Sequence, residues 1–401
     1  MKDHVVERVI LLSLWAALAL ACKSPGDAET TATGTATEAA TTDTGSAPTT
    51  GGDATTTTDG TTSGTSNGTG GMTGEPTTGA TDTGDTTGGE GGVRPPEPGP
   101  MIAPDGDGVV LAISRFFIGN TDRDGTPNQE DGWRQYGYDL DHTISDAGST
   151  DVCLPRAGAD PGMVYPDGDD GIDNNFGKLI LPILLDISAD LGAQQDDTVM
   201  DGKYTLLFDL QQLGTGADYN PLLTRHYIGA ELGSAPKFDG TDAWPVDPAS
   251  LVDPADILTP KLALADSYVT GNTWVGVASP DATLTLRIGP LDLQLRHAVI
   301  TMDLDASHQS VPRGTLAGVL SVVELRDAFK EFAGAFDPGL CEGASLESIL
   351  TQVEQAADIL LGPPQDPTKQ CDAISIGIGF EAARVKLGAI AAAVPEQDFC
   401  P

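Results

Sequence analysis

The sequence predicts a β-rich α+β fold, with an antiparallel β-sandwich-like body and two helices near the C-terminus. Three observations predict this class. Runs of alternating apolar residues, each long enough for a strand, lie between positions 205 and 380. Two apolar stripes with helical spacing lie near the C-terminus. A long Thr- and Gly-rich segment that lacks core-forming residues precedes both patterns, which confines the fold to the residues after it.

The N-terminus has the pattern of an export signal. Lys2 and Arg8 precede an apolar stretch over 9–20, which is shorter than the roughly 20 residues of a spanning helix. The segment Ala19-Leu20-Ala21-Cys22 resembles the lipobox of bacterial lipoproteins. The resemblance implies a signal peptide over 1–21, lipidation of Cys22, and anchoring on a lipid bilayer without spanning it. The alternative is an ordinary secretory signal that happens to end near a cysteine.

Residues 22–95 are predicted to form a disordered tether behind the lipidated cysteine. The segment is dominated by Thr, Gly, Asp, Ala and Ser, without aromatic residues, so it cannot bury enough apolar area to offset its conformational entropy. About 70 residues of such chain reach roughly 45–50 Å. Lys23, rather than Asp, follows the cysteine, and in familiar lipoproteins this favours the outer membrane. Residues 96–401 then form one large domain or two subdomains.

The chain is strongly acidic. It has 59 Asp and Glu against 21 Lys and Arg, a formal charge of −38. A surface of this sign repels phosphate, which argues against nucleic acid as a partner and against electrostatic binding to anionic lipid headgroups.

The clearest strand signal is a hairpin over 283–296. Apolar residues alternate on both sides of Gly289-Pro290, and a two-residue loop that begins with Gly suits a type II′ turn. This register pairs Ile288 with Leu291, Leu286 with Leu293, Leu284 with Leu295, and Arg287 with Asp292. Further strands are expected over 205–210, 298–304 and 374–380.

Two helices are expected near the C-terminus. Ser321 and Glu324 match a capping box, and an apolar stripe begins at Leu325. A second stripe extends from Leu346 to Leu360. Both stripes are interpreted as core-facing.

Four cysteines follow the lipobox, at positions 153, 341, 371 and 400. An even number in an exported chain indicates two disulfides, with three connectivities open. Local pairing favours Cys341 with Cys371, which leaves Cys153 for Cys400. The alternative, a metal–thiolate site, lacks the usual close Cys-x-x-Cys spacing.

One acidic loop, Asn120–Asp131, resembles the twelve-residue calcium loop of EF-hands. Calcium needs six to eight oxygens, and alternate residues of a tight turn can direct theirs to one point. The resemblance implies Ca²⁺ ligands at Asn120, Asp122, Asp124, Thr126 (through its carbonyl), Asn128 and Asp131. The sequence departs from the pattern at Asp131, which replaces the usual Glu, and at Pro127, which argues against a paired EF-hand domain. The alternative is a solvated Asp/Gly turn.

A second acidic loop has the same chemistry without a regular spacing. Asp167, Asp169, Asp170 and Asp173 place four carboxylates within seven residues. They would repel one another unless they are solvated or neutralised by a cation. A further calcium site and a plain turn are equally compatible with this pattern.

An aromatic stretch lies between the two loops. Trp133, Tyr136 and Tyr138 either pack into the core or form a carbohydrate platform, in which Asp139 or Asp141 accepts sugar hydroxyls. Core packing is the favoured interpretation.

The sequence therefore predicts a lipid-anchored surface protein whose calcium-stabilised module has a non-enzymatic binding or structural role. The partners it implies are the bilayer at Cys22 and a glycan or a surface protein. No HExxH, G-x-S-x-G, P-loop or dinucleotide motif is present in 96–401. The alternative function is a surface hydrolase that cleaves polysaccharide with a pair of carboxylates.

Overall fold

A computed structural model describes residues 92–336, 338–395 and 399–400. The chain divides into residues 1–82 and 83–401, and all described residues belong to the second unit. The predicted signal peptide, the lipobox at Cys22 and the tether up to residue 91 lie outside the described residues. Among the helices of the described part, none combines the length and apolarity needed to cross a bilayer.

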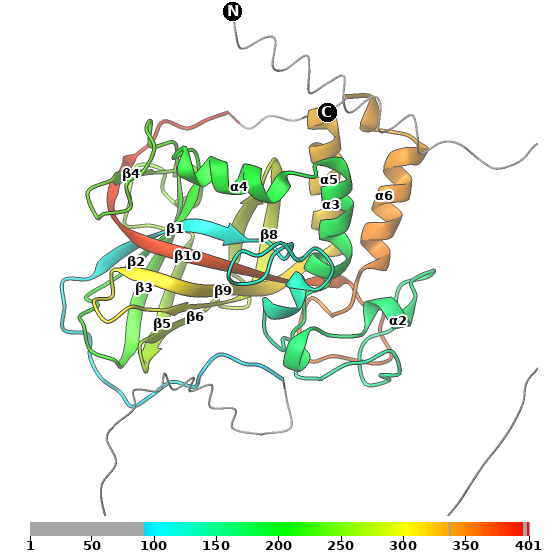
Figure 1. Cartoon of the computed structure of the whole chain (residues 1–401), viewed down its shortest axis with the longest axis horizontal. Coiled ribbons are helices and arrows are strands. Elements are labelled where there is room, and N and C mark those ends of the chain that lie inside the picture. Colours follow the sequence, from blue (N-terminus) through cyan, green and yellow to red (C-terminus); the bar gives the residue numbers. More distant parts are fainter. Residues whose placement is uncertain (1–91, 337, 396–398, 401) are drawn as a thin grey trace, which may run out of the picture. The chain divides into compact units, whose positions relative to one another are not determined.

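The centre of the fold is one antiparallel sheet that closes on itself (Figure 1). Eight strands form the closed cycle in the order β1-β2-β3-β5-β6-β8-β9-β10, and β10 pairs with β1. Their bounds are β1 Val109–Phe117, β2 Thr205–Leu210, β3 Tyr219–Gly229, β5 Leu262–Thr270, β6 Thr273–Val277, β8 Leu291–Asp303, β9 Ser310–Ser321 and β10 Ala373–Ile390. Two further strands attach outside the cycle: β4 (Ala243–Val246) beside β10 and β7 (Thr283–Ile288) beside β8.

The β-rich α+β class is confirmed, but the sandwich-like body is not, because one closed sheet replaces two facing sheets. The long strands are interrupted by bulges, such as the register shifts between Arg296 and Val299 and between Phe380 and Ala382. Bulges bend and twist a sheet until its edges meet. Alternating apolar residues occur in both architectures, so the sequence pattern did not distinguish them.

The predicted hairpin is confirmed in every pair. Strands β7 and β8 pair Ile288 with Leu291, Leu286 with Leu293, Leu284 with Leu295 and Arg287 with Asp292. Gly289 has the positive φ, 58°, that the turn requires. Arg287 Nε lies 2.7 Å from Asp292 Oδ1 on the exposed face. The strands expected over 291–296 and 298–304 form one strand, β8, with His297 (φ 50°) at the bulge between them.

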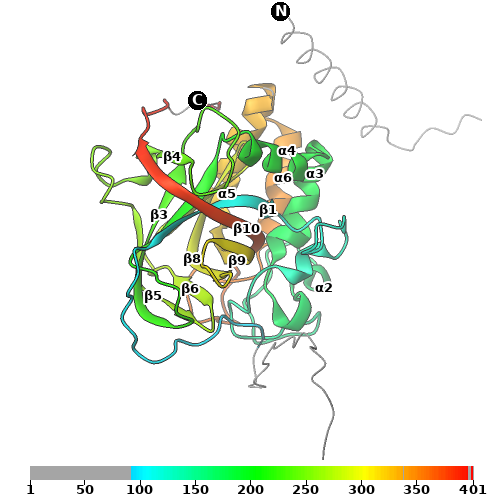
Figure 2. The ribbon, with the colours of Figure 1, turned by 60° about the vertical axis from the view of Figure 1, so that its left-hand side comes forward.

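Helices gather on one side of the closed sheet, with β5 and β6 on the other side (Figure 2). The two predicted helices are α5 (Val322–Phe336) and α6 (Ala344–Gln355), while the last residues of the second stripe are buried beyond the end of α6. The Glu324 side chain binds Arg296 on β8. The sequence did not indicate α2 (Pro161–Val164), α3 (Leu181–Ile187) and α4 (Leu191–Met200). In α4 only Leu191, Gln195 and Val199 are buried, which is too few for a clear apolar stripe.

Both disulfides form, with a pairing other than the local one. Cys153 bonds to Cys371 and Cys341 bonds to Cys400. A backbone bridge at Leu154, whose carbonyl accepts the Cys371 N–H at 2.8 Å, brings the first pair together. The Phe399 N–H donates to Glu331 of α5 at 2.8 Å, and this contact holds the C-terminal residues near Cys341. Proximity in the sequence was therefore a poor guide to these contacts.

Candidate metal centre

Two buried asparagines fasten the acidic segments against β10. Asn174 Nδ2 donates to the carbonyls of Trp133, Tyr136 and Gly377 at 3.0–3.1 Å. Its Oδ1 accepts the Gly377 N–H at 3.0 Å. Glycine is required at 377, because a Cβ there would collide with the Tyr136 carbonyl. The Asn175 N–H binds the Ser375 hydroxyl at 2.8 Å. Loops from two distant parts of the sequence are thus held against one strand.

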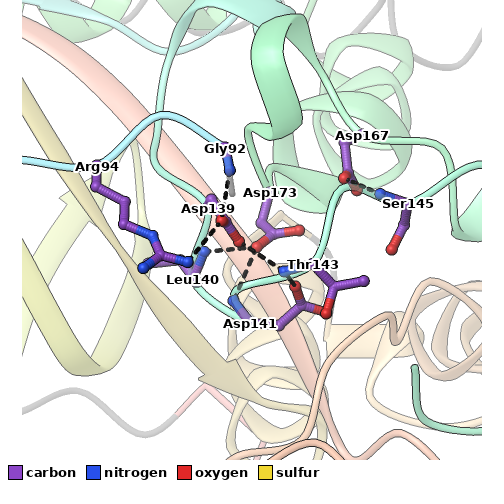
Figure 3. Close-up of polar contacts among 9 residues, drawn as sticks. All are labelled: Gly92, Arg94, Asp139, Leu140, Asp141, Thr143, Ser145, Asp167 and Asp173. Atoms are coloured by element: carbon purple, nitrogen blue, oxygen red, sulfur yellow. Dashed lines mark hydrogen bonds and ion pairs between the residues drawn. The ribbon is translucent and has the colours of Figure 1, made fainter. Parts of the chain in front are cut away.

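The same packing brings three carboxylates together, those of Asp139, Asp141 and Asp173. One oxygen from each lies within 4.8 Å of the others, and among the described residues no other three His, Cys, Asp or Glu side chains meet in this way. Asp139 and Asp173 are only 3% and 6% exposed, whereas Asp141 is half-buried. Figure 3 shows the three side chains close to one another in the loops outside the sheet. We call this group the Asp triad.

Backbone N–H groups orient the side chains of the Asp triad but do not neutralise their negative charges. Asp173 Oδ2 accepts the backbone N–H groups of Leu140 (2.6 Å) and Asp141 (3.2 Å). The Thr143 N–H lies 2.8 Å from Asp141 Oδ1 and 3.0 Å from Asp139 Oδ1. Neither Asp141 Oδ2 nor Asp173 Oδ1 has a hydrogen-bond partner within the described residues. Two carboxylate oxygens therefore remain for a cation.

Among the described residues, one positively charged side chain contacts the Asp triad, that of Arg94 in the segment before β1. Arg94 Nη2 lies 3.3 Å from Asp139 Oδ2, which also accepts the Gly92 N–H at 2.9 Å. Arg94 is 43% exposed while the Asp139 side chain is fully buried. One partly solvated guanidinium offsets one charge and leaves two carboxylates without a counter-ion.

The electrostatic cost of this arrangement appears in the pKa values. Burial, then repulsion from Asp139, raises the pKa of Asp141 to about 7. Burial, then repulsion from Asp141 and Asp167, raises the pKa of Asp173 well above its usual range. Such groups bind a proton or a metal ion in preference to remaining charged side by side.

Two more aspartates, Asp167 and Asp358, lie close enough to repel the charge of Asp173. Asp167 accepts the Ser145 N–H at 2.5 Å, and burial with repulsion from Asp141 raises its pKa to about 7. Burial also raises the pKa of Asp358 to about 6. Burial lowers the pKa of Lys178 to about 8, although the nearby charges of Asp358 and Asp167 act in the opposite direction. The buried Ser145 hydroxyl has no partner among the described residues and adds one more free oxygen in this region.

The second acidic loop divides between two environments. Asp173 joins the Asp triad and Asp167 lies beside it, whereas Asp169 is exposed and binds Arg134 at 3.0 Å. Asp170 is also exposed, with a positive φ of 51°. Only part of this predicted ligand set therefore converges.

The EF-hand-like loop closes as a short hairpin in which several of its oxygens have protein partners. The Asp122 N–H binds the Thr126 carbonyl at 2.8 Å, and the Asn128 N–H binds the Asn120 carbonyl at 2.9 Å. Asp122 Oδ1 accepts the side-chain amides of Asn128 (2.8 Å) and Gln135 (2.6 Å).

Two further side chains of this loop have local partners, whereas those of Asn120 and Asp131 have no hydrogen bond within the described residues. Asp124 Oδ1 accepts the Thr126 N–H at 2.8 Å, and Asn128 Oδ1 accepts the Asp131 N–H at 3.0 Å. Calcium binding by this loop stays a prediction.

The aromatic stretch packs into the core, as the favoured interpretation expected. Trp133, Tyr136 and Tyr138 are 6%, 0% and 8% exposed. Their hydroxyl and indole groups bind within the protein, as when Tyr138 and Thr301 share a hydrogen bond of 2.7 Å. The sequence predicts a sugar-accepting role for Asp139 or Asp141 and no metal role. The signal for a metal role was their alternate spacing directly after this buried aromatic run.

No protein-family model, curated protein or solved structure matches this chain. The fold and the site define it as a β-rich α+β protein with a closed antiparallel sheet and a buried group of three aspartates.

Proposed function

We propose that this protein is a lipid-anchored surface module whose folded region binds Ca²⁺ at the Asp triad and serves a non-enzymatic binding role. The observation that carries the cation site is the approach of three carboxylates, two of them buried. Among the described residues, only the partly solvated Arg94 contacts them as a counter-ion. Hard divalent cations prefer such oxygen ligands, and calcium tolerates the irregular geometry of loops better than magnesium does.

The role of the ion follows from the charges. Bringing three ionised aspartates within a few ångströms costs free energy in a partly desolvated site, and a divalent cation converts that repulsion into attraction. The triad joins the 139–141 segment to the segment before Phe176, so a bound ion would fasten both loops and stabilise the native state.

The first test compares melting temperatures of the mature chain, purified in detergent, in excess Ca²⁺ and in chelator. At 100 times its dissociation constant a ligand that binds only the native state stabilises by roughly 2.7 kcal/mol. We expect Asp173→Asn to remove this gain and Asp122→Ala to retain it. The opposite pattern would assign calcium to the EF-hand-like loop. If Ca²⁺ does not raise the melting temperature of the wild type, the cation proposal is refuted.

The anchor is proposed from the lipobox at Cys22, and it is tested separately. Cells that express the protein are fed a radiolabelled fatty acid, with Cys22→Ser as the control. We expect label in the wild-type protein alone, together with recovery in the membrane fraction. Recovery of an unlabelled wild-type protein in the medium would refute the anchor without affecting the cation site.

The hydrolase alternative also depends on carboxylates, and the Asp triad suits it poorly. Asp139 and Asp173 are almost fully buried, and backbone N–H groups hold them from the protein side. A polysaccharide must reach the acid and the base directly. Incubation with a polysaccharide panel separates the functions, since product release would indicate the hydrolase and saturable binding without turnover the module.

A further inference from the structure

A cavity of about 350 Å³ lies away from the Asp triad, where β3 and the start of β5 face the β7–β8 hairpin. Its volume is at the lower end of the range for small-molecule sites, roughly 300–1,000 Å³. His226 of β3 lines it together with Thr285 of β7 and Gln294 of β8, and Glu324 of α5 contributes to its wall. Strands of the sheet thus form one part of the wall, and the segments that contain Ser250, Lys261 and Asp281 form the rest.

The feature that points to a ligand is His226. It is 4% exposed, and its Nε2 is buried without a hydrogen-bond partner among the described residues. Its ring lies 5.2 Å from that of Phe208, so one side of the imidazole packs against the core. A buried polar atom without a partner is destabilising, and an apolar side chain of the same shape would fill this place better. Because His226 is a lining residue of the cavity, a ligand seated there is the candidate for the missing partner.

The polar groups around His226 are mostly neutral. Thr285 Oγ1 donates to Gln294 Oε1 at 3.0 Å. The buried Ser250, whose hydroxyl donates to the Asp247 carbonyl at 2.6 Å and can still accept, also lines the wall. Burial lowers the pKa of His226 to about 4, so the imidazole is uncharged at neutral pH. The inner surface thus offers hydroxyls, an amide and an imidazole.

The charged groups of the cavity balance one another. Arg296 and Glu324 form an ion pair, and Lys261 and Asp281 are both exposed, one of each sign. Two positive and two negative side chains give no net preference for a charged ligand. This separates the cavity from the rest of an acidic chain.

We infer that this cavity binds a neutral polyhydroxylated molecule, the size of one sugar ring or the terminal sugar of a glycan. A hydroxyl group both donates and accepts, so it can satisfy His226 Nε2 in either tautomer. Several adjacent hydroxyls match the mixed donors and acceptors of Thr285, Gln294 and Ser250. A site built to bind hydroxyls discriminates strongly against analogues that lack them.

This inference deepens the proposed binding function and rests on it, but it is independent of the cation. The triad residues do not line the cavity. A calcium-induced rise in melting temperature without sugar binding would therefore refute the cavity inference and leave the cation proposal standing. Sugar binding without a calcium effect would do the reverse.

The experiment titrates the calcium-loaded mature chain with neutral sugars (glucose, galactose, mannose and N-acetylglucosamine) and with charged analogues (glucuronate and glucosamine), followed by saturation-transfer NMR. An array of immobilised glycans distinguishes a free sugar from a glycan terminus as the natural source. We expect at least one neutral sugar to bind and to exceed its charged analogues in affinity. A uniform absence of binding, or a preference for the charged analogues, would overturn the inference.

Variants at one position separate hydrogen bonding from packing. His226→Phe keeps a ring against Phe208 and removes the polar atoms, so affinity should fall at least tenfold while the melting temperature is unchanged or higher. His226→Gln retains a donor and an acceptor and should bind more tightly than His226→Phe. Thr285→Val provides a second, nearly isosteric loss of a hydroxyl if the first variant folds poorly. Unchanged affinity in both His226→Phe and Thr285→Val would contradict the assignment.

Discussion

Replacing Asp141 by asparagine should stabilise the calcium-free protein, which is the reverse of what loss of an ordinary structural contact would do. The substitution removes one of three clustered charges and changes the shape very little. The asparagine Oδ1 can still accept the Thr143 N–H, which lies 2.8 Å from Asp141 Oδ1. What disappears is the repulsion from Asp139 and the cost of burying the charge.

The magnitude follows from the pKa of Asp141, which burial and Asp139 raise from 3.8 to about 7. The folded state therefore binds a proton more tightly than the unfolded chain does. The resulting cost is absent below pH 3.8, grows up to about pH 7 and is constant above it. About 3 pKa units at roughly 1.4 kcal/mol each set an upper limit of about 4 kcal/mol. Because neighbouring aspartates share the protons, we expect a gain of roughly 1–3 kcal/mol at pH 8.

Thermal and denaturant unfolding of the mature chain in chelator measures this gain. Asp141→Asn should melt several degrees above the wild type at pH 8 and equal to it near pH 4. In excess Ca²⁺ the order should reverse, because the variant has lost a ligand. Asp169→Asn is the matched control, since Asp169 is exposed and paired with Arg134. A calcium-free Asp141→Asn that is less stable than the wild type at pH 8 would refute the reasoning.

Three further outcomes are expected. Between pH 7 and pH 4, acid should destabilise the wild type by about 3 kcal/mol more than His226→Phe, because burial lowers the folded pKa of His226 from 6.5 to about 4. If urea unfolding shows that both proteins lose the same free energy of unfolding over this range, the prediction is wrong. Asn174→Ala should cost about 3 kcal/mol or more, since several buried backbone groups lose their partner; calorimetry that shows less than about 1 kcal/mol would contradict the role of this side chain. Replacing Cys153 and Cys371 by serine opens a cross-link between residues 218 apart and should cost about 5 kcal/mol in the chain-entropy model, measured as the shift in denaturant midpoint against the wild type.

Local patterns predicted local structure well. The hairpin over 283–296 followed from period-two alternation and a Gly-Pro turn, which depend only on neighbouring residues. Helices α5 and α6 followed in the same way from their apolar stripes. Closure of the sheet did not follow, because it depends on bulges such as the one at His297 that leave no mark in the alternation.

At the candidate site too, the sequence predicts what neighbouring residues determine but not which distant segments come into contact. The sequence predicts Asp173 to be a ligand in an acidic loop, but its partners Asp139 and Asp141 come from a segment about thirty residues earlier. Asn174 brings the two segments together, and nothing in the sequence separates this asparagine from its neighbour Asn175. The disulfide pairing depended on equally distant contacts.

Isothermal titration of the mature, chelator-treated chain with Ca²⁺, beside Asp141→Asn and Asp122→Ala, tests the central claim most directly. The account predicts one tightly bound ion per chain at the Asp triad, lost or weakened at least tenfold in Asp141→Asn and retained in Asp122→Ala. Tight binding that is unaffected by Asp141→Asn, or the absence of binding to the wild type, would contradict it.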